Sequence, residues 1–150
     1  MIVIGFGGNV GGDDAIIERF RRAREALGAV RSAALYRTKA IGPEQADFLN
    51  TAVAIELDTT PSQLIATVLE IEGLLGRDRR SEVRWGPRKI DLDVLVWDDR
   101  VIQTPELEVP HPRLYERRFA LQPLADLMAV DPARLAAVAD QQLELVSREW

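Results

Sequence analysis

The chain has 150 residues, of which 47% are hydrophobic and 29% charged, proportions typical of a globular protein with one domain over residues 1–150. Because there is no cysteine, disulfides, zinc–thiolate sites and thiol nucleophiles are excluded, and we expect a cytoplasmic protein. The net charge of −5 argues against nucleic-acid binding, and we expect neither a signal peptide nor an apolar run of about 18 residues to span a membrane.

Apolar spacing and chain breakers divide the first half of the chain into a strand, a helix and two more strands. Asp13 or Asp14 can cap the helix, and Gly28 can end it. The elements expected here are a strand at Met1–Ile4, a glycine-rich connection at Gly5–Gly12, a helix to about Leu27, and strands at Val30–Tyr36 and Phe48–Leu57 with a loop at Thr38–Asp47 between them.

The second half begins with a helix whose start is well marked. Thr60, Pro61 and Gln63 supply an N-cap, a first-turn proline and a capping-box partner, and Gly76 ends the helix. The elements expected after it are an arginine-rich loop, a strand at Ile90–Trp97, short extended segments at Val101–Ile102 and Leu107–Val109, a helix over Leu114–Leu127 broken near Pro123, and a last helix from Asp131 to about Leu143.

The order strand, helix, strand, strand, helix, strand predicts the fold class. Two successive strands without a helix between them favour an antiparallel sheet over a doubly wound parallel one. We therefore predict an α+β protein with a ferredoxin-like βαββαβ antiparallel sheet, helices packed on it, and extra C-terminal helices.

The glycine-rich segment before the first helix has the position of a dinucleotide-binding loop. Val10 stands where that motif needs Gly or Ala, and the strand order also disagrees with a Rossmann fold. Two interpretations stay open: a tight connection that uses glycine for positive φ, and a loop that lines a ligand site.

Two aspartates interrupt the hydrophobic strand predicted at Ile90–Trp97. Asp91 and Asp93 would lie on one strand face with Cα atoms roughly 7 Å apart. Leu95 and Trp97 lie an even number of residues after the aspartates, so a regular strand would place them on the same face. Because both are apolar, a strand face that is simply exposed to solvent fits poorly. Two metal ions that bridge a polyphosphate lie about 3.5–4 Å apart, and carboxylates at this spacing can converge on such a pair.

The loop before this strand, from Arg77 to Lys89, is strongly basic and contains six basic and two acidic residues. Such a run is often only a solvated surface loop. Arginine has a planar fork that suits phosphate, and aspartates that can bind metal follow at once. The combination therefore favours a phosphorylated substrate.

Three further residues are candidates on weaker grounds. His111 is the only histidine, and because arginines follow it at Arg113 and Arg117, a phosphate-contacting role and a structural role are about equally open. Phe48 and Asn50 share one strand face, so they could stack on and hydrogen-bond a flat heterocycle, or simply pack.

Four stretches in this order resemble the 6-hydroxymethyl-7,8-dihydropterin pyrophosphokinase family, and the resemblance covers Gly7 to about Leu124. It implies an enzyme of folate biosynthesis that transfers a pyrophosphoryl group from ATP to the hydroxymethyl group of the pterin, leaving AMP. The resembling stretches are Leu35–Thr38, Phe48–Val53, Arg84–Asp93 and Val109–Leu114.

The resemblance also implies a site. Asp91 and Asp93 would hold two Mg²⁺ ions on the ATP phosphates, and Trp85 would belong to a mobile loop that closes over them. The loop after Gly76 is one residue longer than usual in the family, so Arg79 and Arg80 could exchange roles. The implied residues are Arg79, Arg88, Asp91 and Asp93 for catalysis; Glu72, Arg77, Arg79, Arg88, His111 and Arg117 for ATP; and Thr38, Phe48, Asn50 and Phe119 for the pterin.

Two other functions remain as alternatives. A non-catalytic ferredoxin-like module would bind nucleotide or pterin without turnover. A sheet-surface RNA binder would need stacking aromatics and a basic face, and the acidic balance and 6% aromatic content count against it. We expect the enzyme, acting as a monomer on ATP and the hydroxymethyl dihydropterin.

Overall fold

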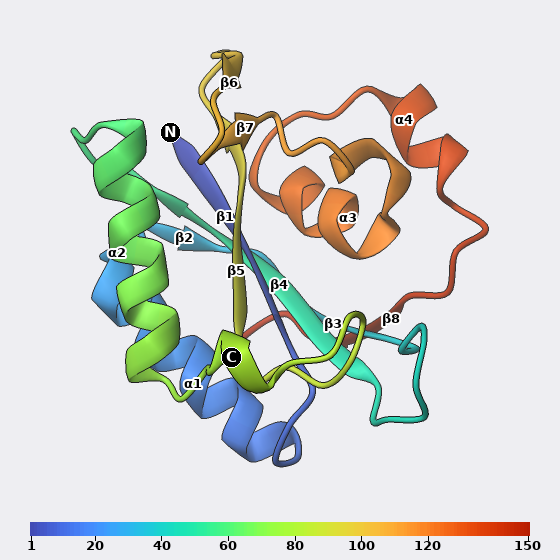
Figure 1. The fold of residues 1–150 in the computed structure, drawn as a ribbon. Helices are drawn as coiled ribbons and strands as arrows, with labels where there is room; N and C mark the ends of the chain where they lie inside the picture. The colour runs from blue at the N-terminus through green and yellow to red at the C-terminus, as the bar shows by residue number, and fades with distance from the viewer.

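In the computed structural model, which describes residues 1–150, helices cover both faces of one six-stranded antiparallel sheet (Figure 1). Its strands follow the order β5-β1-β4-β3-β8, with β2 also paired to β4. The strands are β1 (Ile2–Gly8), β2 (Arg31–Ser32), β3 (Leu35–Thr38), β4 (Phe48–Ile55), β5 (Asp91–Trp97) and β8 (Glu144–Ser147), with β6 (Ile102–Gln103) and β7 (Glu108–Val109) in a separate hairpin.

Two apolar cores lie on opposite faces of the sheet. The first core joins the sheet to α1 and α2, and the second joins it to α3. The neighbours β5-β1-β4-β3 are all antiparallel, which confirms the ferredoxin-like α+β fold. The helices are α1 (Asp13–Leu27), α2 (Pro61–Leu74), α3 (Arg118–Leu127) and α4 (Pro132–Ala137), with 3-10 turns η1 (Arg79–Ser81) and η2 (Leu114–Glu116).

The start of α2 is as predicted, and that of α1 is not. Thr60 accepts a hydrogen bond from the Gln63 backbone while the Gln63 side chain accepts one from the Thr60 backbone, which completes the capping box. In α1 the N-cap is Gly12, so Asp13 and Asp14 lie inside the first turn. There their carboxylates interact favourably with the helix dipole.

The glycine-rich segment is mostly strand. β1 continues to Gly8, so Gly5–Gly8 pair with neighbouring strands, and the predicted connection shrinks to the residues before α1. Only Gly11 and Gly12 in this segment have positive φ, at 97° and 84°. The interpretation as a tight glycine connection therefore holds for those two residues alone.

The strand expected at Val30–Tyr36 divides into β2 and β3, and β3 includes Thr38, which was predicted to lie in a loop. The last helix ends at Ala137 rather than near Leu143, and β8 follows and pairs with β3. The residues of β8 are mostly exposed, so its sequence has little of the apolar alternation that marks a half-buried strand.

The break expected near Pro123 lies elsewhere. α3 runs through Pro123, which removes only one backbone donor from the helix. The interruption is at Arg117, whose extended backbone (φ −125°, ψ 110°) separates η2 from α3.

A β-bulge changes the faces of β5. Ile4 pairs with Val94 and Val3 with Val96, which leaves Leu95 as an extra residue. Leu95 and Val96 both enter the second core, whereas Trp97 enters the first. The prediction that Trp97 shares a face with Asp91 and Asp93 is therefore wrong, although Leu95 does share it.

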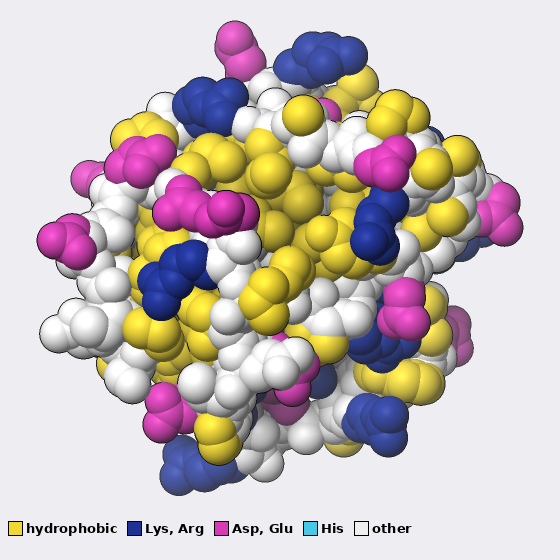
Figure 2. Space-filling model, turned by 90° about the horizontal axis from the view of Figure 1, so that it is seen from above, with side chains coloured by type: hydrophobic (Ala, Val, Ile, Leu, Met, Phe, Trp, Pro, Cys, Tyr) yellow, Lys and Arg dark blue, Asp and Glu magenta, His cyan; other side chains and the backbone are white.

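Figure 2 shows the end of the molecule that carries the N-terminus and the β6–β7 hairpin, opposite the Asp91 end of β5. Apolar side chains gather there, and those of Leu57 (47% exposed) and Val101 (73% exposed) belong to loops after β4 and before β6. Arginine and lysine side chains stand singly around them. None of the helices has the length and hydrophobicity to cross a membrane.

Candidate active site

Four residues form one row across the sheet, on the face that α3 covers. Asp91 pairs with Gly7, Gly7 with Asn50, and Asn50 with Tyr36. In the next row on the same face, two residues along each strand, Asp93 pairs with Gly5. Because Gly7 has no side chain, β1 leaves the sheet surface open between Asp91 and Asn50, whereas the Leu95 side chain lies over Gly5. A Cβ at Gly7 would lie 3.4 Å from the Asn50 Oδ1.

The two aspartates differ in their partners. The Asp91 Oδ1 accepts a hydrogen bond from Arg77 Nη1 at 2.8 Å, whereas the carboxylate of Asp93 accepts none from the protein. Burial, together with the negative charges of Asp91 and Glu72, raises the pKa of Asp93 to about 7. A cation beside Asp93 would relieve both effects.

These carboxylates fit Mg²⁺. The structure contains no group of three or more His, Cys, Asp or Glu side chains arranged to hold a metal, so protein groups alone would not form a complete shell. Mg²⁺ is commonly held by one or two carboxylates together with substrate phosphates and water. The pair on β5 matches that type of site.

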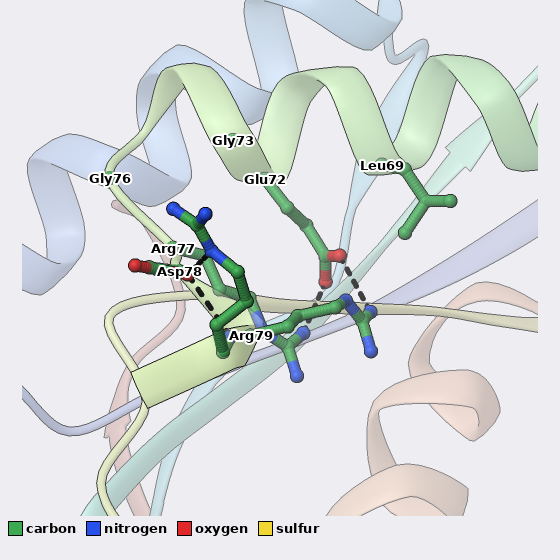
Figure 3. Close-up of a pocket in the computed structure, with 8 residues that line it drawn as sticks. Leu69, Glu72, Gly73, Gly76, Arg77, Asp78 and Arg79 are labelled. Atoms are coloured by element: carbon green, nitrogen blue, oxygen red, sulfur yellow. Dashed lines mark hydrogen bonds and ion pairs between the residues drawn. The ribbon is translucent and has the colours of Figure 1, made fainter. Parts of the chain in front are cut away.

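Glu72, at the end of α2, is the centre of a buried ion-pair network. Its side chain points toward the guanidinium groups of Arg77 and Arg79, and these residues line an open pocket (Figure 3). Glu72 is 1% exposed and accepts from Arg77 Nη1 at 2.6 Å, from Arg79 Nη2 at 2.8 Å and from the backbone of Leu92 at 2.8 Å. Since Leu92 lies between the aspartates, Glu72 also fixes the start of β5.

The structure distinguishes Arg79 from Arg80, the two residues that were predicted to be able to exchange roles. Arg79 contacts Glu72, whereas Arg80 is 92% exposed and pairs only with Asp78. The structure therefore directs Arg79, not Arg80, toward Glu72, whose other partner Arg77 contacts Asp91.

Arg77 and Arg88 share a carboxylate that the sequence did not single out. Glu82 accepts from Arg77 Nε at 2.9 Å and Nη2 at 3.0 Å, and its Oε1 lies 3.2 Å from Arg88 Nε. Burial alone would lower the pKa of Arg77, but Glu82, Asp91 and Glu72 raise it above the usual value. Both arginines are thus engaged with protein groups.

Asn9 joins three loops, and sequence reasoning missed it too. Its backbone donates to Arg88 O at 2.9 Å, and its Oδ1 accepts from Arg88 N at 2.8 Å. Its Nδ2 donates to Gln45 Oε1 (2.8 Å) and Ala46 O (2.9 Å), and Gln45 in turn donates to Trp85 O (2.7 Å). The only signal in the sequence is that Asn9 is the one polar side chain among glycines.

The predicted lid residue Trp85 lies in this assembly. Its ring is half exposed and lies under the guanidinium of Arg84, 4.9 Å from ring centroid to Cζ. A Cβ at Gly42 would come within 3.1 Å of the Trp85 Cβ, so the β3–β4 loop lies against it.

The residues predicted to bind pterin lie on the other side of β1 from the aspartates. Asn50 is 4% exposed and donates from Nδ2 to Thr38 Oγ1 at 2.8 Å. Phe48 begins β4 on the same strand face, and Phe119 lies in the first turn of α3, a helix that packs against β4. Both rings are partly exposed.

His111 and Arg117 complete the charged side of the site. Burial and the charge of Arg117 lower the pKa of His111, so it is neutral at pH 7. Burial and Arg113 lower the pKa of Arg117, and the negative charges of Asp93 and Asp91 act in the opposite direction. These interactions place both side chains in the electrostatic field of the aspartates.

Comparisons with known proteins found a matching family model and several relatives. A family model described as 7,8-dihydro-6-hydroxymethylpterin-pyrophosphokinase matches residues 3–129. Three relatives are each named 2-amino-4-hydroxy-6-hydroxymethyldihydropteridine pyrophosphokinase. They come from Bacillus subtilis (39% identical over 144 residues, covering 93% of this chain and 85% of the relative), Synechocystis (36% over 138 residues, 87% and 68%) and Methylorubrum extorquens (40% over 128 residues, 83% and 80%).

Proposed function

Because the chain belongs to the 7,8-dihydro-6-hydroxymethylpterin-pyrophosphokinase family, and is thus an enzyme of pyrophosphoryl transfer in folate biosynthesis, we propose that the sheet surface around Gly5 and Gly7 is its active site. The enzyme transfers the pyrophosphoryl group of ATP to the hydroxymethyl group of 6-hydroxymethyl-7,8-dihydropterin and releases AMP. One observation carries the assignment: Asp91 faces Asn50 across Gly7, which has no side chain, and Asp93 lies on the same strand face as Asp91.

On the phosphate side, Asp91 and Asp93 would hold two Mg²⁺ ions, which neutralise charge on the phosphate chain when bound. Arg77 contacts Asp91 and Arg79 contacts Glu72, and together with Arg88 they would donate to phosphate oxygens. Phosphoryl-type transfer depends mostly on positioning and charge stabilisation, which these fixed guanidinium groups supply.

Other residues complete the ATP-binding site and form the lid. Glu72 orients Arg77 and Arg79, because its oxygens are already engaged by protein donors. Neutral His111 can donate one hydrogen bond to a phosphate oxygen, and Arg117 adds a positive charge beside it. Trp85 closes over the nucleotide with its loop and excludes water.

On the other side of β1, the pterin binds with its ring between Phe48 and Phe119. The Asn50 amide, held by Thr38, hydrogen-bonds the edge of the heterocycle. Gly7 leaves room for the ring to reach Asn50, since nothing projects from β1 at that row. The hydroxymethyl group then points toward the aspartates and the phosphate chain.

The single sheet shared by both cores supports one domain over residues 1–150. Action as a monomer in the cytoplasm stays a prediction.

The test is AMP release from ATP, Mg²⁺ and the hydroxymethyl dihydropterin, followed by chromatography. Asp91→Ala and Asp93→Ala should each lower the rate by a factor of about 100–1,000, the size of effect seen when a key electrostatic stabiliser is removed. Asp99→Ala is the matched control, because Asp99 is exposed and has no ion pair. Wild-type protein that binds both ligands and releases no AMP would establish the non-catalytic module instead.

A further inference from the structure

The carboxylate of Glu82 lies between two arginines that we assign to the phosphate chain. Arg77 donates to it through two nitrogens at 2.9 and 3.0 Å, and Arg88 Nε lies 3.2 Å from Oε1. A phosphate group accepts from guanidinium groups with the same two-pronged geometry. One carboxylate thus makes the contacts that a phosphate would make.

This contact differs from an ordinary surface ion pair. The side chains of Arg77, Glu82 and Arg88 are only 6%, 13% and 16% exposed. In the same loop, Asp78 and Arg80 form a pair whose side chains are 49% and 92% exposed. Exposed pairs contribute little, whereas a partly buried bidentate contact with two cations is a substantial competitor for any other anion.

Most of the other N–H groups of the two arginines are also engaged. Arg88 donates from Nη1 to Gly86 O and Pro87 O and from Nη2 to Val83 O. Arg77 Nη1 donates to Glu72 and Asp91. Each arginine therefore has only one N–H group left for phosphate while Glu82 keeps its place.

We propose that Glu82 is an affinity-determining residue of the ATP site, which occupies a phosphate position until the nucleotide displaces it. This inference rests on the proposed function, because it takes Arg77 and Arg88 as phosphate-binding groups. The cost of moving Glu82 into water is subtracted from the binding free energy of the nucleotide. The loop that carries Glu82 also carries Trp85, so displacement of the carboxylate accompanies rearrangement of the lid.

The test compares two substitutions that each remove one negative charge from this loop. Glu82→Gln should bind inorganic tripolyphosphate and a non-hydrolysable ATP analogue, each with Mg²⁺, roughly tenfold more tightly by calorimetry, which corresponds to about 1.4 kcal/mol. Asp78→Asn is the control and should leave both dissociation constants unchanged, since Arg80 does not contact the other arginines. Glu82→Asp keeps the charge but is too short to reach both arginines, so it should tighten binding by a smaller factor.

Two results would overturn the proposal. One is unchanged or weaker tripolyphosphate binding by Glu82→Gln with its melting temperature retained. The other is an equal gain from Asp78→Asn, which would show that general loop charge sets the affinity. If Glu82→Gln fails to fold, Glu82→Asp decides by the same criterion. Because the probes need no turnover, absence of AMP release from wild type would refute the enzymatic assignment separately.

Discussion

Replacing Glu72 by alanine should destabilise the protein and disorganise the arginines together. The carboxylate is 1% exposed and accepts three hydrogen bonds, from Arg77, Arg79 and the backbone of Leu92. Removing one partner of a buried ion pair costs about 3–5 kcal/mol. Arg77 keeps Glu82 and Asp91 as partners, so the lower end of that range applies to the guanidinium.

The unpaired backbone N–H of Leu92 adds to this loss, because an unsatisfied buried donor costs about 1–3 kcal/mol. We therefore expect a total loss of about 4 kcal/mol in the free energy of unfolding. For a chain of this size each kcal/mol shifts the melting temperature by about 2–4 °C, so the expected decrease is roughly 10 °C.

Urea unfolding followed by circular dichroism measures the loss directly. Glu70→Ala is the control, since Glu70 lies in α2 two residues earlier, is exposed and makes no ion pair. Its effect should stay within about 0.5 kcal/mol. A loss below about 1 kcal/mol for Glu72→Ala would refute the reasoning, because it would mean that water or another acceptor replaces the carboxylate without cost.

Two more predictions concern the loops and pH. Asn9→Ala removes the hydrogen bonds that join the loops of Gln45 and Arg88, so it should raise KM for both substrates severalfold, and a rise for only one would contradict a joint role. In metal-free buffer, the raised pKa of Asp93 means that the folded state binds the proton more tightly than the unfolded chain. The contribution of Asp93 to stability should therefore fall as pH rises from about 4 to 7, the interval between the ordinary and raised pKa values. Asp93→Asn should flatten that fall in a thermal melt, and an unchanged profile would rule Asp93 out as its cause.

Local patterns predicted much of the fold. The capping box at Thr60 and Gln63 and the breaker Gly28 act within a few residues, so α2 begins and α1 ends where expected. The strand order also follows from local elements, since a split βαβ pattern has few antiparallel arrangements. By contrast, the bulge at Leu95 depends on pairing with β1, which lies far away in the sequence.

The candidate site also combines residues that a local pattern reveals with residues that it does not. Asp91 and Asp93 are visible because aspartate is unusual inside a strand. The roles of Asn9 and Glu82 were missed for different reasons. Asn9 contacts Arg88 79 positions away, so no short pattern records the pair. Glu82 lies only five positions from Arg77, but a single acidic residue among many arginines looks like ordinary charge balance in a loop.

The extra residue at Leu95 has a consequence for how mutations along β5 are to be understood. In a regular strand, an insertion or deletion of one residue exchanges the two faces of every residue beyond it. Here the bulge already absorbs one such shift, so straightening β5 with all its residues kept would exchange the faces of one end relative to the other. Either Trp97 would leave the first core or Asp91 and Asp93 would enter it. Deletion of Leu95 would instead keep both faces, because Val94 opposite Ile4 and Val96 opposite Val3 would then alternate regularly and Trp97 would stay in the first core. We therefore expect this deletion to cost the packing of the Leu95 side chain in the second core but not the positions of the two aspartates.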